Sequence, residues 1–174
     1  MSHHTRTPAR ATPRFRTLTT TECESLLRRA KVGRIAYAFR DRVDIEPIHF
    51  VYRDGWVVWR TAPGAKLETL EHNRWVAFEV DEVRGVFDWR SVVLHGSAYP
   101  LDEVADAVLP RARAEALALL RRIVPGTGTA ADPVPWRSRV YHMQVERMSG
   151  RASTTRPLAR ERPAASRRRR VLVP

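Results

Sequence analysis

Short apolar segments bounded by turn residues recur through the first 150 positions, which is typical of strands joined by hairpins. The last of them, SRVYHMQVERM at residues 138–148, alternates apolar and polar positions, as a strand with one buried face does. Five earlier segments are also predicted as strands. They are residues 33–39, 43–52, 56–61, 75–81 and 89–100.

Two features refine the second and third of these strands. Asp54-Gly55 lies between them and predicts a tight hairpin turn. Pro47 interrupts the second strand. Because proline has no N–H to donate to a neighbouring strand, we expect this strand to lie at a sheet edge or to carry a bulge at Pro47.

Three helical patterns separate the strands. Thr19 and Glu22 form a capping box, so the first helix is expected to begin after Thr19. Residues 64–73 predict a short second helix. A third pattern begins with DEVADAVL at residues 102–109, and Pro110 then either kinks a continuous helix or begins a second one in its first turn.

Six strands with few helices between them argue against a doubly wound parallel sheet and favour a small antiparallel barrel. Such a barrel fills its own interior with side chains. A large ligand would therefore need an external groove, which a second subunit often completes.

The net charge of +12 suggests nucleic acid, so the position of the charge matters. Residues 1–16 hold four arginines and no acid, and residues 151–174 hold eight arginines and one acid. Residues 17–150 hold 19 basic and 18 acidic residues and are nearly neutral. The sequence thus predicts a disordered basic arm at 1–16, a folded domain at 17–150 and a disordered Arg-rich tail at 151–174.

The basic tail leaves two interpretations open. RRRR at residues 167–170 can contact RNA, DNA or acidic lipid, or it can be a solvated tail in a chain biased toward arginine, which we favour. The single Cys23 excludes an internal disulfide and a cysteine-based zinc site. No apolar run approaches the roughly 18 residues of a membrane helix, and the first residues lack the apolar stretch of a secretory signal. A cytoplasmic protein is expected.

The segment WRTAPGAK, residues 59–66, is a candidate phosphate site. A predicted strand ends, the backbone turns through Gly64, and a helix begins with free N–H groups and partial positive charge. Arg60, Thr61 and Lys66 add two cations and a hydroxyl to that turn. The spacing of a P-loop is absent. The alternative is a solvated turn with surface charges.

The order and spacing of four stretches resemble a known family. The stretches are ECESLLRRAKVGRIAYAF, EPIHFVYRDGWVVWRTAPGAKLETLEHNRWVAFEVDE, WRSVVLHGSAYPL and, for the final strand, SRVYHMQVERMSGR. They resemble the flavin-binding split barrels related to pyridoxamine 5′-phosphate oxidase, in particular the nitroimidazole-resistance and general flavin-binding branch. The resemblance is continuous over residues 17–103 and excludes both basic ends.

This resemblance implies a mainly β fold with peripheral helices: a six-stranded antiparallel split β-barrel that forms a homodimer, with FMN in the groove between subunits. Three residues would lie beside the flavin ring, largely through their backbone. They are Ile48, His49 and Phe50. Four residues would lie at the phosphate, and Ser91 near the phosphate or ring. The four are Arg60, Thr61, Ala65 and Lys66.

Several of these positions have other interpretations or depart from the family. Gly64 and Ala65 stand where relatives often carry further cationic or hydroxyl residues, a loss for which Arg60 would compensate. Ile48 and Phe50 can simply be core residues, and His49 a barrel histidine. Two further pairs of residues have possible roles. Trp136 and Arg139 would reach the groove from the other subunit, and Glu79 and Asp81 would cap a strand or pair with arginines.

The resemblance also implies the reaction. We expect an FMN-dependent oxidoreductase that reduces a small electrophile, such as a nitro compound or quinone, with a nicotinamide donor, and no metal. Pyridoxamine phosphate oxidation is not expected, because VERMSGRAS lacks the Trp- and Arg-rich end that grips that substrate's phosphate. No residue is assigned as catalytic. The alternatives are a non-enzymatic binder of flavin, deazaflavin or haem, or a nucleic-acid partner acting through the basic tail.

Overall fold

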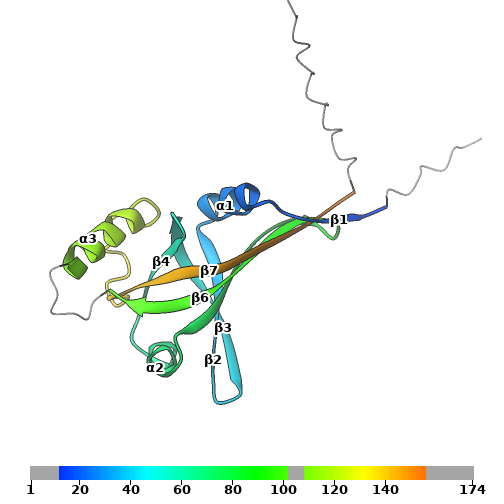
Figure 1. Ribbon diagram of the computed structural model, residues 1–174. Coiled ribbons are helices and arrows are strands. Elements are labelled where there is room, and N and C mark those ends of the chain that lie inside the picture. The colour runs from blue at the N-terminus through cyan, green and yellow to red at the C-terminus, as the bar shows by residue number, and fades with distance from the viewer. Residues whose placement is uncertain (1–11, 102–107, 156–174) are drawn as a thin grey trace, which may run out of the picture.

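Seven strands and three helices make up the part of the chain that the computed structural model describes, residues 12–101 and 108–155 (Figure 1). The strands are β1 (Arg14–Thr17), β2 (Val32–Phe39), β3 (Arg42–Arg53), β4 (Trp56–Thr61), β5 (Trp75–Gly85), β6 (Asp88–Pro100) and β7 (Arg139–Thr154). The helices are α1 (Thr20–Arg29), α2 (Ala65–His72) and α3 (Val108–Leu120). No described helix has the length and apolar character needed to cross a membrane.

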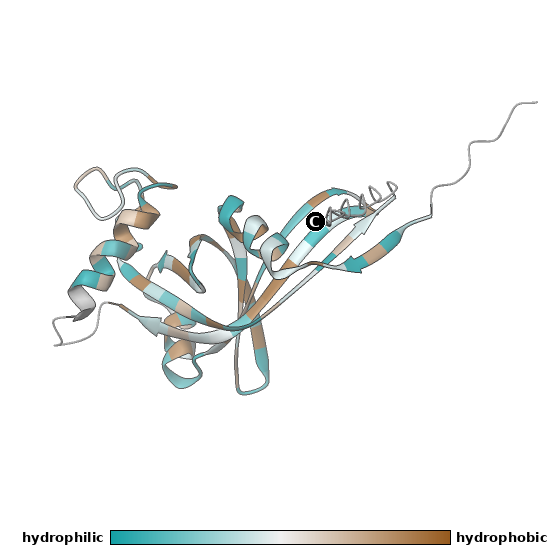
Figure 2. Cartoon of the chain, turned by 45° about the horizontal axis from the view of Figure 1, so that its top comes forward, coloured by the Kyte–Doolittle hydropathy of each residue, from teal (hydrophilic) through white to brown (hydrophobic). Residues whose placement is uncertain are grey.

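The strands pair in the order β1-β7-β4-β3-β2-β5-β6, and β6 pairs in turn with β7. Every pairing is antiparallel. Strands β2 to β7 therefore close on themselves, which confirms the predicted six-stranded antiparallel barrel. Figure 2 shows apolar and polar residues alternating along these strands, as a barrel with a filled interior requires.

Strand β3 is shared between two partners. Its first part, Arg42 to His49, pairs with β2, and its last four residues pair with β4. Pro47 lies in the part that pairs with β2 alone, opposite Arg34. Around Pro47, one side of β3 is therefore a sheet edge, as predicted. Further along, β3 is no longer an edge, because β4 pairs with it from Phe50 onward.

The capping box predicted at the start of α1 is confirmed. The Glu22 backbone N–H donates to the Thr19 hydroxyl at 3.3 Å, and the Thr19 N–H donates to the Glu22 carboxylate at 2.9 Å. Arg16 pairs with the same carboxylate at 2.6 Å and, with the Thr19 N–H, lowers the pKa of Glu22 to about 2. α1 buries Leu26 and Leu27 against the barrel.

The barrel core joins the inner faces of all six closing strands with α1 and α2. Its largest fully buried side chains are Trp59, Phe50, Phe78, Leu27, Ile35, Leu70, Leu94 and Met143. The register of β6 and β7 shifts between His95 and Gly96, where Glu146 of β7 has no opposite residue. A Cβ on Gly96 would lie 1.9 Å from the Gln144 carbonyl oxygen, so this bulge requires glycine.

Both ends of the described chain extend the fold beyond its predicted limits. β1 was not predicted; it pairs with the end of β7, with Arg14 opposite Thr154. The folded domain was predicted to span residues 17–150, whereas β1 begins at Arg14 and β7 ends at Thr154. The rest of the predicted arm and tail lies outside the described residues.

The described part of helix α3 runs from Val108 to Leu120 and includes Pro110. The first part of the predicted third helix, residues 102–107, lies outside the described residues. α3 and β1 lie at opposite ends of the molecule (Figures 1 and 2). Turns and loops from residue 121 to 138 connect α3 to β7.

Candidate functional site

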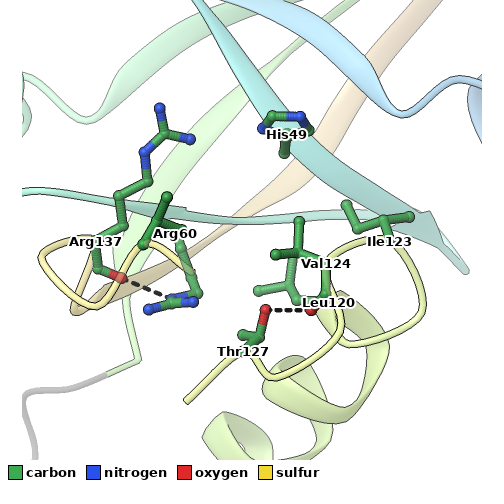
Figure 3. Close-up of a pocket in the computed structure, with 8 residues that line it drawn as sticks. His49, Arg60, Leu120, Ile123, Val124, Thr127 and Arg137 are labelled. Carbon is green, nitrogen blue, oxygen red and sulfur yellow. Dashed lines mark hydrogen bonds between the residues drawn. The ribbon is translucent and has the colours of Figure 1, made fainter. Parts of the chain in front are cut away.

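A cavity of about 180 Å³ lies where β3 and β4 face α3 and the loop that follows it (Figure 3). It brings together two residues predicted for the site, His49 and Arg60. The other lining residues come from the end of α3 and the following loop. They are Leu120, Ile123, Val124, Thr127, Val134 and Arg137.

One wall of this cavity is apolar and held by local hydrogen bonds. Leu120, Ile123 and Val124 supply aliphatic side chains at the end of α3. The buried hydroxyl of Thr127 donates to the Val124 carbonyl at 2.7 Å, and Arg121 donates to the Thr127 carbonyl at 2.9 Å. These bonds close the turns after α3, so the wall has a defined shape.

Arg60 fastens the loop to β4. Its guanidinium pairs with Asp132 at 2.8 Å and donates through Nε to the Arg137 carbonyl at 2.6 Å. The two charged side chains are only 9% and 3% exposed. A buried and paired guanidinium of this kind holds its neighbours in place, so Arg60 fixes the position of the loop relative to the barrel.

Asp132 receives hydrogen bonds from its own loop as well. Besides Arg60, it accepts from the backbone N–H of Gly128 at 2.7 Å and of Val134 at 3.0 Å. Arg60 and these N–H groups lower the pKa of Asp132 to about 2. One carboxylate therefore organises both the loop and its attachment.

This pKa predicts acid sensitivity of the loop. Because the folded pKa lies below the ordinary value of 3.8, Asp132 stabilises the fold fully above pH 3.8 and loses that contribution as the pH falls to about 2. Asp132→Asn should abolish this pH dependence and lower stability at pH 7. Denaturant unfolding between pH 2 and 7 measures it, with the exposed Asp54→Asn as control; identical pH profiles for Asp132→Asn and the wild type would contradict the prediction.

The second cationic residue predicted for the site, Lys66, also has an internal partner. Lys66 lies in the first turn of α2 with its side chain 9% exposed, and its ammonium pairs with Glu46 at 2.8 Å. The Tyr37 hydroxyl donates to the other Glu46 oxygen. Burial favours a raised pKa for Glu46, but the hydrogen bonds from Lys66 and Tyr37 outweigh it and lower that pKa.

The remaining predicted residues divide between the core, the turn and a distant strand. Ile48 and Phe50 are buried in the core, and His49 between them is exposed on the opposite face of β3. Thr61 is buried just before the turn into α2, and its hydroxyl donates to the Ala62 carbonyl at 3.3 Å. Ala65 is the first residue of α2.

Ser91 lies apart from the cavity, on β6, three strands along the sheet from β3. Its hydroxyl donates to Glu79 at 2.8 Å. Arg34 pairs with Glu79 at 3.1 Å and also with Asp81, so the predicted pairing of these carboxylates with an arginine is confirmed. Among the described residues no group of His, Cys, Asp or Glu is arranged to hold a metal ion.

Most of the residues that line the cavity were not predicted as site residues. Trp136 is exposed and Arg139 begins β7 opposite Thr61, but neither lines the cavity. The residue that organises the loop, Asp132, was predicted only as part of a loop. One local signal was available, since an acidic residue followed by Pro133 in an arginine-rich region commonly organises a turn.

The closed six-stranded barrel with helices at its periphery defines the chain as a split-barrel protein. The sequence profile of the family described as pyridoxamine 5′-phosphate oxidase matches residues 19–152. The chain belongs to this family, which confirms the resemblance seen in the sequence. Among curated proteins, none matches the chain.

Solved structures of similar proteins agree with this assignment. A FAD-binding protein from Mesorhizobium loti is 25% identical with a TM-score of 0.66, over 82% of this chain and 99% of its own. The FAD-binding protein of Mycobacterium smegmatis is 29% identical with a TM-score of 0.57, over 79% and 98%. A candidate 5-nitroimidazole antibiotic resistance protein from Bacteroides thetaiotaomicron, 17% identical, shares the fold with a TM-score of 0.60 over 87% and 95%.

Proposed function

We propose that this chain is a flavin-dependent oxidoreductase that binds FMN in a groove between two copies of the chain. The observation that carries the proposal is the path from β3 through β4 into α2. It places His49 on an exposed strand face, and it places Thr61, Ala65 and Lys66 at the helix start where the family resemblance puts the flavin phosphate.

The flavin ring would lie along β3. Because Ile48 and Phe50 point into the core, their contact with a ring would be through the backbone, whereas the His49 side chain faces outward. The N–H groups in the first turn of α2 and the Lys66 ammonium would meet the phosphate. Arg60, already bound to Asp132, would act by holding the cavity wall beside the ring.

Two relatives named above are described as FAD-binding, and FAD contains the same ring and first phosphate as FMN. The proposed contacts of β3 and α2 therefore apply to either nucleotide.

An apolar outer face supports the proposed homodimer. Val43 and Ile45 of β3 are 72% and 62% exposed. Ile45 lies opposite Ala36 of β2, which lies opposite Ala77 of β5, so small and apolar side chains continue across three strands. The cavity of about 180 Å³ is also below the roughly 300–1,000 Å³ of most ligand sites, as expected if a second copy completes the groove.

A bound flavin would accept a hydride from a reduced nicotinamide and pass it to a small electrophile such as a nitro compound or quinone. The residues of this chain would hold the ring, exclude water through the apolar wall of α3 and its loop, and leave one face of the ring open. No residue of the chain is assigned as catalytic.

The absorbance spectrum of the purified protein tests the proposal, recorded before and after adding FMN or FAD and removing free flavin by gel filtration. We expect retained flavin bands and a mass of two chains by light scattering. A retained FAD with no retained FMN would correct the nucleotide. A colourless protein after both additions would overturn the flavin proposal and leave deazaflavin or haem to be tried in the same way.

The contact between Glu46 and Lys66 predicts an affinity change of its own. The Lys66 ammonium already pairs with the Glu46 carboxylate at 2.8 Å. A flavin phosphate must therefore share Lys66 with Glu46 or displace Glu46 from it. Glu46→Gln removes the competing charge, keeps an acceptor for Tyr37, and should tighten FMN binding by about fivefold to tenfold. Fluorescence quenching measures it, with the exposed Glu68→Gln as control; unchanged or weaker binding by Glu46→Gln would contradict it.

A further inference from the structure

Arg137 gives the cavity a positive charge that is unpaired among the described residues. Of the two arginines in the lining, Arg60 is paired with Asp132, whereas no carboxylate in the described part of the chain pairs with Arg137. In Figure 3 the Arg137 side chain extends away from the Arg60 guanidinium, on the side of the site where His49 lies.

The backbone of Arg137 is fixed, although none of the described carboxylates pairs with its guanidinium. Its N–H donates to the Val134 carbonyl at 3.0 Å, and its carbonyl accepts from Arg60 at 2.6 Å. A side chain anchored at its base by two hydrogen bonds is placed with less loss of freedom than one on a loose loop. Arg137 is therefore suited to receive an anionic group from a ligand.

The opposite side of the cavity is suited to an aromatic ring. Leu120, Ile123 and Val124 form an aliphatic surface there. An enclosed aliphatic cavity of about 150 Å³ takes up benzene, so the roughly 180 Å³ available here accommodates one six-membered ring with a small substituent.

We propose that this cavity binds a single-ring aromatic carboxylate. The ring packs on Leu120, Ile123 and Val124, the carboxylate pairs with the fork of Arg137, and His49 contacts the remaining edge. The binding itself requires no flavin, whereas its role as the substrate pocket rests on the proposed function. The neutral amide of the same ring is disfavoured, because it leaves the Arg137 guanidinium without an anion.

Calorimetric titration of the full chain tests the site with three probes: benzoate, benzamide and acetate. Benzoate should bind at least tenfold more tightly than either of the others, because only benzoate offers both a ring and a charge. Arg137→Gln should weaken benzoate binding at least tenfold, and Arg137→Lys should restore part of it. Arg122 is an exposed arginine in the same connection between α3 and β7, and Arg122→Gln should bind benzoate like the wild type.

Three results would overturn the inference: no benzoate binding to the wild type, equal binding of benzoate and benzamide, or unchanged binding by Arg137→Gln. Thermal unfolding of each variant shows whether it is folded before its affinity is compared. The same titration after flavin loading separates the two proposals. Benzoate binding by a protein that retains no flavin would reject only the proposed function, and retained flavin without benzoate binding would reject only this inference.

Discussion

Replacing Lys66 with alanine should weaken FMN binding by about 10- to 100-fold. Lys66 lies in the first turn of α2, and its ammonium pairs with Glu46 of β3 at 2.8 Å. A hydrogen bond between charged groups contributes about 1.5–3 kcal/mol, which corresponds to that loss of affinity. The measurement is the FMN dissociation constant from quenching of flavin fluorescence.

The chain offers a matched control, since its other lysine is the exposed Lys31 on the segment before β2. Lys31→Ala should bind FMN like the wild type. Lys66→Met keeps much of the buried aliphatic stem and should lose affinity as Lys66→Ala does, which separates lost charge from lost packing. Equal affinities for Lys66→Ala and the wild type would reject the phosphate role of this turn.

Gly96→Ala should destabilise the barrel by about 3 kcal/mol. The new Cβ would lie 1.9 Å from the Gln144 carbonyl oxygen, so β7 must move away from β6 at the bulge. Because the clashing atom is a backbone carbonyl oxygen, rotation of a side chain cannot relieve the contact. The two strands that must move apart are also the pair that closes the barrel. Urea unfolding followed by tryptophan fluorescence measures the change in the free energy of unfolding.

Gly85→Ala is the control for this variant. Gly85 also lies at a register shift, in β5, but a Cβ there would meet no atom within 4 Å. It should change the stability by well under 1 kcal/mol. If Gly96→Ala and Gly85→Ala were equally stable, the close contact at the β6–β7 bulge would not be what holds Gly96 as glycine.

The barrel itself could be predicted because local signals agree with the final structure. Each closing strand buries one face, so its apolar positions follow the pleat, and Asp54-Gly55 marks the hairpin between β3 and β4. The cap at Thr19 is encoded within four residues. Such features depend on neighbours in the sequence and need no knowledge of distant contacts.

The first strand could not be predicted from the same kind of signal. β1 has the sequence RFRT, and three of its four residues are exposed, including Phe15. It buries no face, so its pattern differs little from that of a charged coil. What holds it is backbone pairing with the end of β7, more than 130 positions away along the chain.

The candidate site could be predicted only in part, because its pairings also join distant parts of the chain. Residue types suitable for a site can be recognised in the sequence, and His49 and Arg60 do line one cavity. Which charges are already paired cannot, because Arg60 meets Asp132 and Lys66 meets Glu46 only when the barrel closes. For the same reason, only the fold shows that no described carboxylate pairs with the Arg137 guanidinium.

The pairing of β1 with β7 also determines how the protein can be handled. Arg14 and Thr154 are adjacent across two strands, at the end of the molecule opposite α3 (Figure 1). A tag or tether joined directly before Arg14 or directly after Thr154 would be attached at this end of the fold. Protein immobilised through either position should therefore keep its cavity beside α3 open to ligands in solution.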